Sequence, residues 1–343
     1  MSALRHKPLS LGFKLPHSLE ASAPPEARGL ARDDVSLLVS DARAGSHGVH
    51  AFNALAEFLD PGDLLVVNDS ATIPAALEAK FADEIFWLHL STKISPELWL
   101  VEPRSPTLFE RGAILRLPEC AVVTLLVPSG GLRPRLWYAH IATLGDMSTY
   151  LARNGRAITY TYMNGTWPIS FYQSIFSKES GSVEMPSAGR PFSLRTLEAL
   201  RARKVAIATI TLHCAVASPE RHEPPIMEWM NVSSHVVDAI ETTRAKNKRV
   251  VAVGTTVVRA LESATDETGQ PVAFRGWTDH LVNQDHPPQV ATALLTGFHE
   301  PQASHLTMLE AFTSREFLRS SYNAALRAQL LWHEFGDVHL LLP

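Results

Sequence analysis

The sequence of 343 residues lacks most of the features that would tie a protein to a membrane or to an oxidising compartment. It has only two cysteines, Cys120 and Cys214, whose spacing fits no metal or redox motif, so a reducing compartment is favoured. No apolar run approaches the length of a membrane span, and the apolar stretch within residues 1–16 is too short for a signal peptide. We therefore expect a cytoplasmic protein that makes no membrane contact.

The sequence also lacks the common signatures of metal and nucleotide sites. It contains no His-Glu-x-x-His pair, no Gly-x-Ser-x-Gly turn and no phosphate-binding loop ending in Gly-Lys-Ser or Gly-Lys-Thr. We expect no metal ion, because the fifteen histidines follow no ligand spacing. The net charge of −4 argues against binding of nucleic acid by the whole surface, although it is compatible with a local basic groove.

What the sequence does contain is a strand, a glycine turn and a helix at residues 250–263. Four apolar residues, Val250 to Val253, predict a buried strand, and Gly254 permits a tight turn. Thr255 or Thr256 is expected to cap the helix that follows. Backbone N–H groups, two hydroxyls and the positive end of a helix would then meet at one point, as a carboxylate or phosphate site requires. A plain turn with a threonine cap explains the same pattern.

The order of the strand and helix patterns predicts an α/β protein with an insertion. Strands and helices alternate in the two outer parts of the chain, which favours a mostly parallel sheet. Between them, short strand-like runs separated by proline and glycine suggest a small antiparallel β-barrel. We therefore expect a discontinuous α/β catalytic domain of residues 1–78 and 151–343, interrupted by a barrel domain of residues 79–150.

Polar residues follow several of the expected buried strands. They are Asn68-Asp69, His213, Gly254-Thr255-Thr256 and Thr296 to His299. The carboxyl ends of parallel strands meet at one edge of a sheet, so these residues are expected to converge there. Ordinary turn chemistry explains each of them singly about as well.

Several stretches together resemble the S-adenosylmethionine:tRNA ribosyltransferase-isomerase family of queuosine biosynthesis. The most specific is Val253 to Glu262, which reads Val-Gly-Thr-Thr-x-x-Arg-x-Leu-Glu. The other matches occur in the family's order along nearly the whole chain: Pro61 to Asp69 with Ile73-Pro74-Ala75, Tyr172-Gln173, Gly181-Ser182-Val183 with Pro186 to Gly189, Thr211-Leu212-His213, Gly276 to Asp279, Thr296, Phe298-His299, Pro301 and Phe335-Gly336-Asp337.

The resemblance implies an α/β domain interrupted by a small antiparallel β-barrel, and an unusual use of S-adenosylmethionine as a substrate. In the family, a base removes a proton from the ribose next to the sulfonium and adenine leaves. The aminomethyl group of a deazaguanine base in tRNA then accepts the rearranged ribosyl unit, giving epoxyqueuosine, and methionine is released. The implied partners are therefore S-adenosylmethionine and tRNA.

The same resemblance suggests roles for individual residues. Acid–base chemistry is assigned to three candidates, His213, Glu228 and His299. Substrate binding is assigned to a larger set: Asn68, Asp69, Gln173, Ser187, Ala188, Gly189, Arg190, Gly254, Thr255, Thr256, Arg259, Thr296, Phe298 and Asp337. A structural polar role is an equally good interpretation of His213, Glu228, His299, Asp69 and Asp337.

The chain departs from the family pattern at several polar positions: Ala71, Ala76, Arg190, Pro191, Glu223, Ile226 and Gly297. The first two stand where the family has arginine, a residue suited to gripping phosphate. This suggests two alternatives to the family reaction. One is a diverged paralogue that uses S-adenosylmethionine with a small-molecule acceptor or as a lyase, and the other is a non-catalytic S-adenosylmethionine-binding protein.

Overall fold

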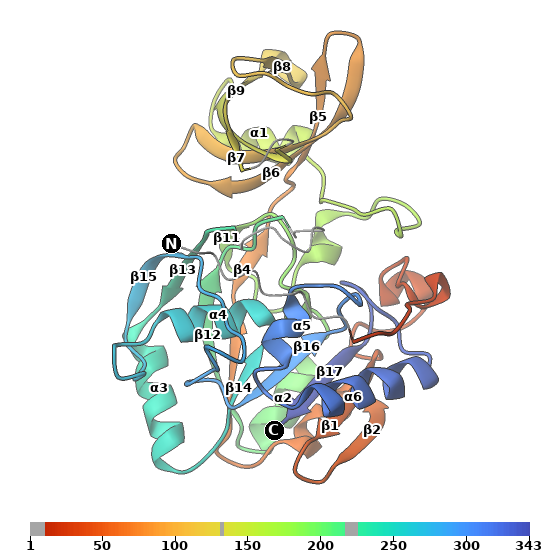
Figure 1. Cartoon of the computed structure of the whole chain (residues 1–343), viewed down its shortest axis with the longest axis vertical. Helices are drawn as coiled ribbons and strands as arrows, with labels where there is room; N and C mark the ends of the chain where they lie inside the picture. The colour runs from red at the N-terminus through yellow and green to blue at the C-terminus, as the bar shows by residue number, and fades with distance from the viewer. Residues whose placement is uncertain (1–10, 131–133, 217–225) are drawn as a thin grey trace.

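A computed structural model of the chain describes residues 11–130, 134–216 and 226–343. Within these residues the strands form a nine-stranded mixed sheet, a closed six-stranded barrel and a two-stranded ribbon. Figure 1 shows the barrel standing apart from the α/β part and joined to it by a narrow connection. The predicted α/β fold with an inserted antiparallel barrel is therefore confirmed.

The large sheet has a parallel centre and antiparallel neighbours. Its order is β15-β13-β12-β3-β14-β16-β17-β1-β2. The four strands β12, β3, β14 and β16 run parallel, whereas β13, β15 and β2 join antiparallel, so the sheet is mixed rather than mostly parallel. The strands are β1 (Ser36–Asp41), β2 (Ser46–Ala51), β3 (Leu64–Asn68), β12 (Ala206–Leu212), β13 (Glu228–Val232), β14 (Val250–Val253), β15 (Phe274–Thr278), β16 (Ala293–Gly297) and β17 (Val338–Leu342).

The central strands are buried on both faces because helices cover both sides of the sheet. In β3, Leu64 and Val66 pack toward one hydrophobic cluster, and Leu65 and Val67 pack toward another. The first cluster includes residues of α3 (Ser234–Ala245), α4 (Thr255–Ser263), α5 (His305–Leu309) and α6 (Arg315–Arg327). The second includes residues of α2 (Leu194–Ala202) and the 3₁₀ helix η3 (Phe52–Phe58). Unbroken apolar runs are what strands covered on both faces require.

Serine side chains cap two of the helices, whereas the helix after the glycine turn has no side-chain cap. Ser193 accepts a hydrogen bond from the N–H of Thr196, and Ser314 accepts one from Phe317, so both cap their helices. The expected threonine cap of α4 is wrong, because Gly254 occupies the cap position with φ +101° and Thr255 is already helical. A positive φ suits glycine, which has no β-carbon to clash with the turn.

The barrel is built around its own apolar core, with Leu77, Leu88, Val101 and Leu125 among its buried residues. Its strands follow the closed order β10-β7-β6-β5-β8-β9. They are β5 (Ala76–Phe81), β6 (Glu84–Lys93), β7 (Leu98–Arg104), β8 (Ile114–Arg116), β9 (Val122–Ser129) and β10 (Leu136–Ala142), and α1 (Met147–Asn154) follows. The domain boundaries, between residues 78 and 79 and between residues 150 and 151, stay a prediction. The first boundary falls inside β5, which begins at Ala76.

The two chain crossings between the barrel and the sheet are bonded to each other. Ala76 and Arg156 exchange two backbone hydrogen bonds of 2.9 Å each. A β-carbon added at Gly155 would lie 2.1 Å from the carbonyl oxygen of Pro74, so the crossings touch where only glycine fits. Next to them, β4 (Ser70–Thr72) pairs with β11 (Glu179–Ser182). We call these paired segments, residues 70–76, 155–156 and 179–182, the neck. They fix the barrel above one edge of the sheet.

None of the helices in the described part of the chain combines the length and the apolar character needed to cross a membrane.

Candidate functional site

The predicted polar residues meet at one edge of the sheet. The parallel strands β12, β3, β14 and β16 end next to one another, and their ends carry His213, Asp69, Gly254 and Gly297. Backbone hydrogen bonds fix the alignment: the N–H of Asp69 donates to Ile210 at 2.9 Å, and that of Gly254 donates to Leu295 at 2.7 Å. Carboxyl ends of parallel strands are common ligand sites in α/β folds.

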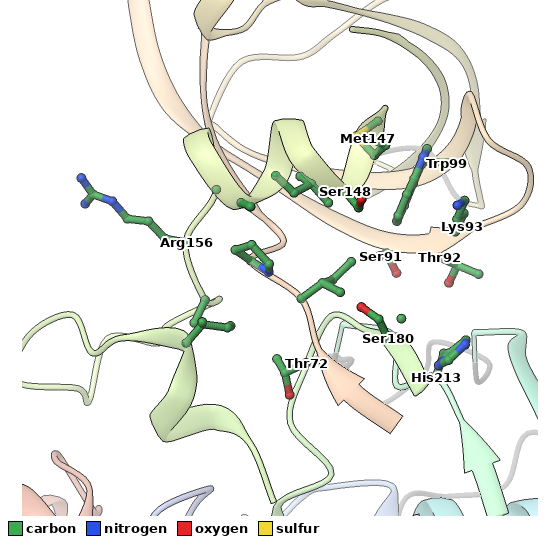
Figure 2. Close-up of a pocket in the computed structure, with 18 of the residues that line it drawn as sticks. Thr72, Ser91, Thr92, Lys93, Trp99, Met147, Ser148, Arg156, Ser180 and His213 are labelled. Atoms are coloured by element: carbon green, nitrogen blue, oxygen red, sulfur yellow. The ribbon is translucent and has the colours of Figure 1, made fainter. Parts of the chain in front are cut away.

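A cavity of about 1270 Å³ lies between this edge and the barrel. Figure 2 shows side chains of the barrel, of α1 and of the α/β part facing the same space. The lining is aromatic, hydroxylated and cationic, and includes Trp99, Trp167, Trp229, Trp277, Ser91, Thr92, Ser148, Lys93 and Arg156. Of the predicted site residues, His213 and Gln173 line it. The cavity therefore covers the part of the edge formed by β12, β13 and β15.

His213 is held on several sides. Its ring stacks on Trp229 with centroids 5.1 Å apart, and its Nδ1 lies 2.8 Å from the hydroxyl of Ser70. A β-carbon added at Gly181 would lie 2.6 Å from Cε1 and Nε2 of the ring. Burial lowers the pKa of His213, Glu179 opposes that shift, and Lys93 adds to it. The imidazole is thus a neutral, fixed group at the cavity wall.

Glu228 at the start of β13 and Arg259 in α4 form a largely buried ion pair, and neither belongs to the lining of the cavity. Oε2 of Glu228 lies 2.5 Å from Nη1 of Arg259, and Oε1 accepts the N–H of Ala215 at 2.9 Å. Burial raises the pKa of Glu228, while the charge of Arg259 and the Ala215 hydrogen bond oppose the increase. Nη2 of Arg259 also donates to the carbonyl of Ile226 at 3.4 Å. Ile226, which departs from the family pattern, therefore still contacts Arg259 through its backbone carbonyl.

His299 lies at the end of β16 and has a neighbour that the sequence did not indicate. Its Nε2 is 3.1 Å from the hydroxyl of Thr296, and its ring stacks on His305 with centroids 4.6 Å apart. Burial is the main cause that lowers the pKa of His299 well below its usual value and that of His305 to about 4. Both imidazoles are therefore neutral near pH 7.

The Gly254 turn lies in contact with the loop Ser187–Gly189. A β-carbon added at Gly254 would lie 3.5 Å from the β-carbon of Ala188, at ordinary contact distance. Ala188 belongs to the 3₁₀ turn Ser187–Gly189. The side chains of Thr255 and Thr256 make no hydrogen bond within the described ranges, so the start of α4 has two hydroxyls to offer.

Other predicted ligand residues are used by the scaffold instead. The amide of Asn68 bonds both backbone groups of Leu212, joining β3 to β12. The amide of Gln173 bonds both backbone groups of Thr72. Asp69 accepts the Thr211 hydroxyl at 2.7 Å, and burial raises the pKa of its carboxyl.

Three more of these residues point into the scaffold. Arg190 is 2% exposed, donates to Glu26 and Phe171, and lies over the ring of Phe335. Phe298 is buried in the large core cluster. Asp337 accepts the backbone N–H groups of Ser36 and Leu331, both at 2.6 Å. In this structure the scaffold occupies the polar atoms of Arg190 and Asp337 and buries the ring of Phe298, and substrate binding by these three residues stays a prediction.

Among the departures from the family pattern, Ala76 is buried at the neck and Gly297 ends β16. Glu223 lies outside the described residues. Within residues 11–130, 134–216 and 226–343, no three His, Cys, Asp or Glu side chains are grouped as a metal site would need.

Comparison with known proteins gives consistent results. The chain matches the family model described as queuosine biosynthesis protein over residues 9–341. It is 31% identical over 341 residues to an S-adenosylmethionine:tRNA ribosyltransferase-isomerase of Trichlorobacter lovleyi, covering 96% of this chain and 98% of that protein. It is 33% identical over 308 residues to the protein of the same name from Thermus thermophilus, covering 84% and 86%.

A solved structure supports the fold. The crystal structure of S-adenosylmethionine tRNA ribosyltransferase from Thermotoga maritima aligns with a TM-score of 0.55 at 24% identity, covering 96% of this chain and 99% of that one. Together with the match over residues 9–341, these relatives show that the chain belongs to the queuosine biosynthesis protein family, whose named members here are transferase-isomerase enzymes.

Proposed function

We propose that the protein transfers and isomerises the ribosyl unit of S-adenosylmethionine onto tRNA, releasing adenine and methionine. The observation that carries the proposal is the aromatic, cationic cavity at the polar edge of the sheet in a chain of this family. The reaction needs a group to move protons at the ribose, a seat for the methionine carboxylate and a pocket for the acceptor base. Each need has a counterpart among the residues around the edge.

The acceptor base is assigned to the cavity. An enzyme that acts on a base in folded RNA must take that base out of its stack and hold it in a pocket. Trp229 and Trp277 are paired across β13 and β15 and both line the cavity. His213 and Arg275 already contact the ring of Trp229, so Trp277 is the candidate on which the base would stack. Ser91 also lines it, and its hydroxyl is buried without a partner in the described part of the chain. A volume of about 1270 Å³ exceeds the usual size of a single small-ligand site, which leaves room beside a nucleotide for the ribosyl donor.

The methionine carboxylate is assigned to the start of α4. There the N-terminal N–H groups of the helix, the Thr255 and Thr256 hydroxyls and the backbone beside Ala188 come together. A helix amino end favours an anion by its dipole and its free donors. The Glu228–Arg259 pair and the His299–His305 pair are the candidates for moving protons near the ribose.

In the family, arginines stand at the positions of Ala71 and Ala76. Three other cationic residues of this chain can take over their contacts with phosphate. Lys93 lies on the barrel side of the cavity, Arg156 lies at the neck, and Arg275 lies over the ring of Trp229. Cations beside stacking platforms are what RNA binding requires, even on a protein whose net charge is −4. The relatives are named for tRNA, and no comparison supports a small-molecule acceptor.

The test is to incubate the protein with S-adenosylmethionine and tRNA that carries the aminomethyl-deazaguanine base. Adenine and methionine should be released in equal amounts, and the tRNA should gain the mass of the ribosyl unit. The control is the same tRNA with an unmodified guanine, which should give no adenine. Absence of adenine with the modified tRNA would overturn the proposal. Adenine release that needs no RNA would mean that the enzyme is a lyase.

Replacing Trp277 with alanine should weaken tRNA binding. We expect a rise in KM or Kd for tRNA of about 5- to 150-fold, equivalent to the roughly 1–3 kcal/mol that a stacked base contributes. Phe274→Ala is the matched control, because Phe274 lies on the same strand, is 37% exposed against 36% for Trp277, and does not line the cavity. Titration of labelled tRNA measures both. Equal effects of the two substitutions would remove Trp277 from the proposed base pocket.

A further inference from the structure

A chain of three hydrogen bonds leads from a backbone amide to the imidazole of His213. The N–H of Cys214 donates to Ser182 Oγ at 2.9 Å, Ser182 Oγ lies 2.7 Å from Ser70 Oγ, and Ser70 Oγ lies 2.8 Å from His213 Nδ1. Both serine side chains are fully buried, and neither hydroxyl has another partner among the described residues. The chain therefore carries a fixed number of protons, and the direction of each hydrogen bond can be worked out.

The backbone amide sets that direction, because an N–H group can only donate. If Ser182 donates to Ser70, then Ser70 donates to Nδ1 of His213, and every proton in the chain has an acceptor. In the opposite arrangement Nδ1 donates to Ser70 and Ser70 donates to Ser182. The hydroxyl proton of Ser182 is then left buried without an acceptor, which is unfavourable. The first arrangement places the proton of a neutral imidazole on Nε2.

The remaining contacts of the ring leave Nε2 as its available atom. Trp229 stacks on the ring, Gly181 lies against it, and Ser70 occupies Nδ1. His213 lines the cavity (Figure 2), and Trp229 belongs to the same lining. An Nε2–H group fixed in this way is a hydrogen-bond donor to whatever occupies the cavity.

We propose that Ser70 and Ser182 are positioning residues that hold His213 as its neutral Nε2–H tautomer, so that His213 donates a hydrogen bond to the ligand instead of removing a proton. The proposal rests on the proposed function only for the identity of the ligand. The acceptor atom of that ligand would be a carbonyl oxygen or a ring nitrogen of a nucleobase. Burial lowers the pKa of His213, which agrees with a neutral ring, and the charged groups that act on it are Glu179 and Lys93. The proton transfer at the ribose is left to other residues of the edge.

The tautomer can be measured without any substrate. In protein labelled with ¹⁵N-histidine, the ring nitrogens of His213 are assigned by the signals that disappear in His213→Gln. At pH 7 they should show a protonated Nε2 and an unprotonated Nδ1. Ser70→Ala removes the hydroxyl that donates to Nδ1, so the Nδ1–H form should rise to a measurable fraction. Ser321→Ala deletes another fully buried serine hydroxyl, in α6, and should leave the His213 signals unchanged.

A wild-type His213 with the proton on Nδ1, or with both nitrogens protonated, would overturn the proposal. This outcome is independent of adenine release, so it separates failure of the tautomer from failure of the proposed function.

Kinetics provide the second measurement. Glutamine can donate from about the position of Nε2 but cannot act as a base near pH 7. We therefore expect His213→Gln to keep kcat within about 10-fold of wild type and His213→Ala to lose about 100-fold or more. Ser70→Thr, which keeps the hydroxyl, should retain more activity than Ser70→Ala. Equal losses in His213→Gln and His213→Ala would assign His213 the role of a base and contradict the donor role.

Discussion

Replacing Gly181 with alanine is expected to lower kcat/KM by about 100-fold or more while the protein stays folded. The added β-carbon would lie 2.6 Å from Cε1 and Nε2 of His213 and 2.7 Å from Cδ2, closer than real β-carbons approach other atoms. The ring has little freedom to yield, because it stacks on Trp229 and is bonded to Ser70. It must turn, which moves Nε2 by an amount on the order of 1 Å, and a displacement of that size can cost about 100-fold in rate.

The matched control for this change is Gly297→Ala. A β-carbon added at Gly297 would meet no atom within 4 Å, and the residue lies at the end of β16 on the same edge of the sheet. It should keep kcat/KM within about 2-fold, and it should not lower stability, since alanine restricts the unfolded chain. Steady-state kinetics and urea unfolding of both variants measure the comparison. If Gly181→Ala has wild-type kcat/KM, His213 does not contribute to the reaction from its present position.

The convergence of the strand ends could be predicted from the sequence because it depends on backbone pattern alone. Leu64 to Val67 and Val250 to Val253 are unbroken apolar runs, and each is buried throughout in the structure. Runs of this kind indicate strands covered on both faces, and parallel strands place their carboxyl ends together. The same reasoning gave the location of His213 and of the Gly254 turn.

The use of each polar side chain could not be predicted in this way. Asn68 ends a buried strand and Asp337 precedes one, which are common positions for ligand residues. Their polar atoms nevertheless bond backbone groups that lie 144 and 301 residues away in the sequence. Arg190 stands in a loop of small residues but is bonded to Glu26 near the start of the chain. Such partners are distant in sequence and leave no local signal, so a residue that holds the scaffold resembles one that holds a ligand.

The cavity was missed for a related reason, since segments far apart in the chain build it. The barrel contributes Trp99, and β13 and β15 contribute Trp229 and Trp277. The sequence of β13 carries little signal, because Glu-Trp-Met-Asn-Val does not alternate apolar with polar residues, and the alternating burial of Glu228 to Val232 is visible only in the structure. For β15 the local indication of a strand is its aromatic residues, Phe274 and Trp277 within Phe274–Thr278.

Replacing Arg259 with methionine is expected to destabilise the protein by about 3–5 kcal/mol, because it leaves the carboxylate of Glu228 buried without its charge partner. Glu228 is 6% exposed, and one of its oxygens lies 2.5 Å from Arg259. The double variant Arg259→Met with Glu228→Gln should recover most of that loss, since glutamine is neutral and can still accept the N–H of Ala215. Urea unfolding of the four proteins measures the coupling.

The loss in Arg259→Met should also depend on pH in a defined direction. Burial raises the pKa of Glu228 even with Arg259 present, and without Arg259 the pKa should rise further. A carboxyl whose pKa is higher in the folded than in the unfolded protein lowers stability as pH rises through the folded value. The deficit relative to wild type should therefore be largest near pH 7 and shrink toward pH 4. Arg153→Met, which breaks the exposed pair with Glu119, is the control and should cost far less at every pH. A pH-independent deficit, or no recovery in the double variant, would show that Arg259 stabilises the protein by packing rather than by its charge.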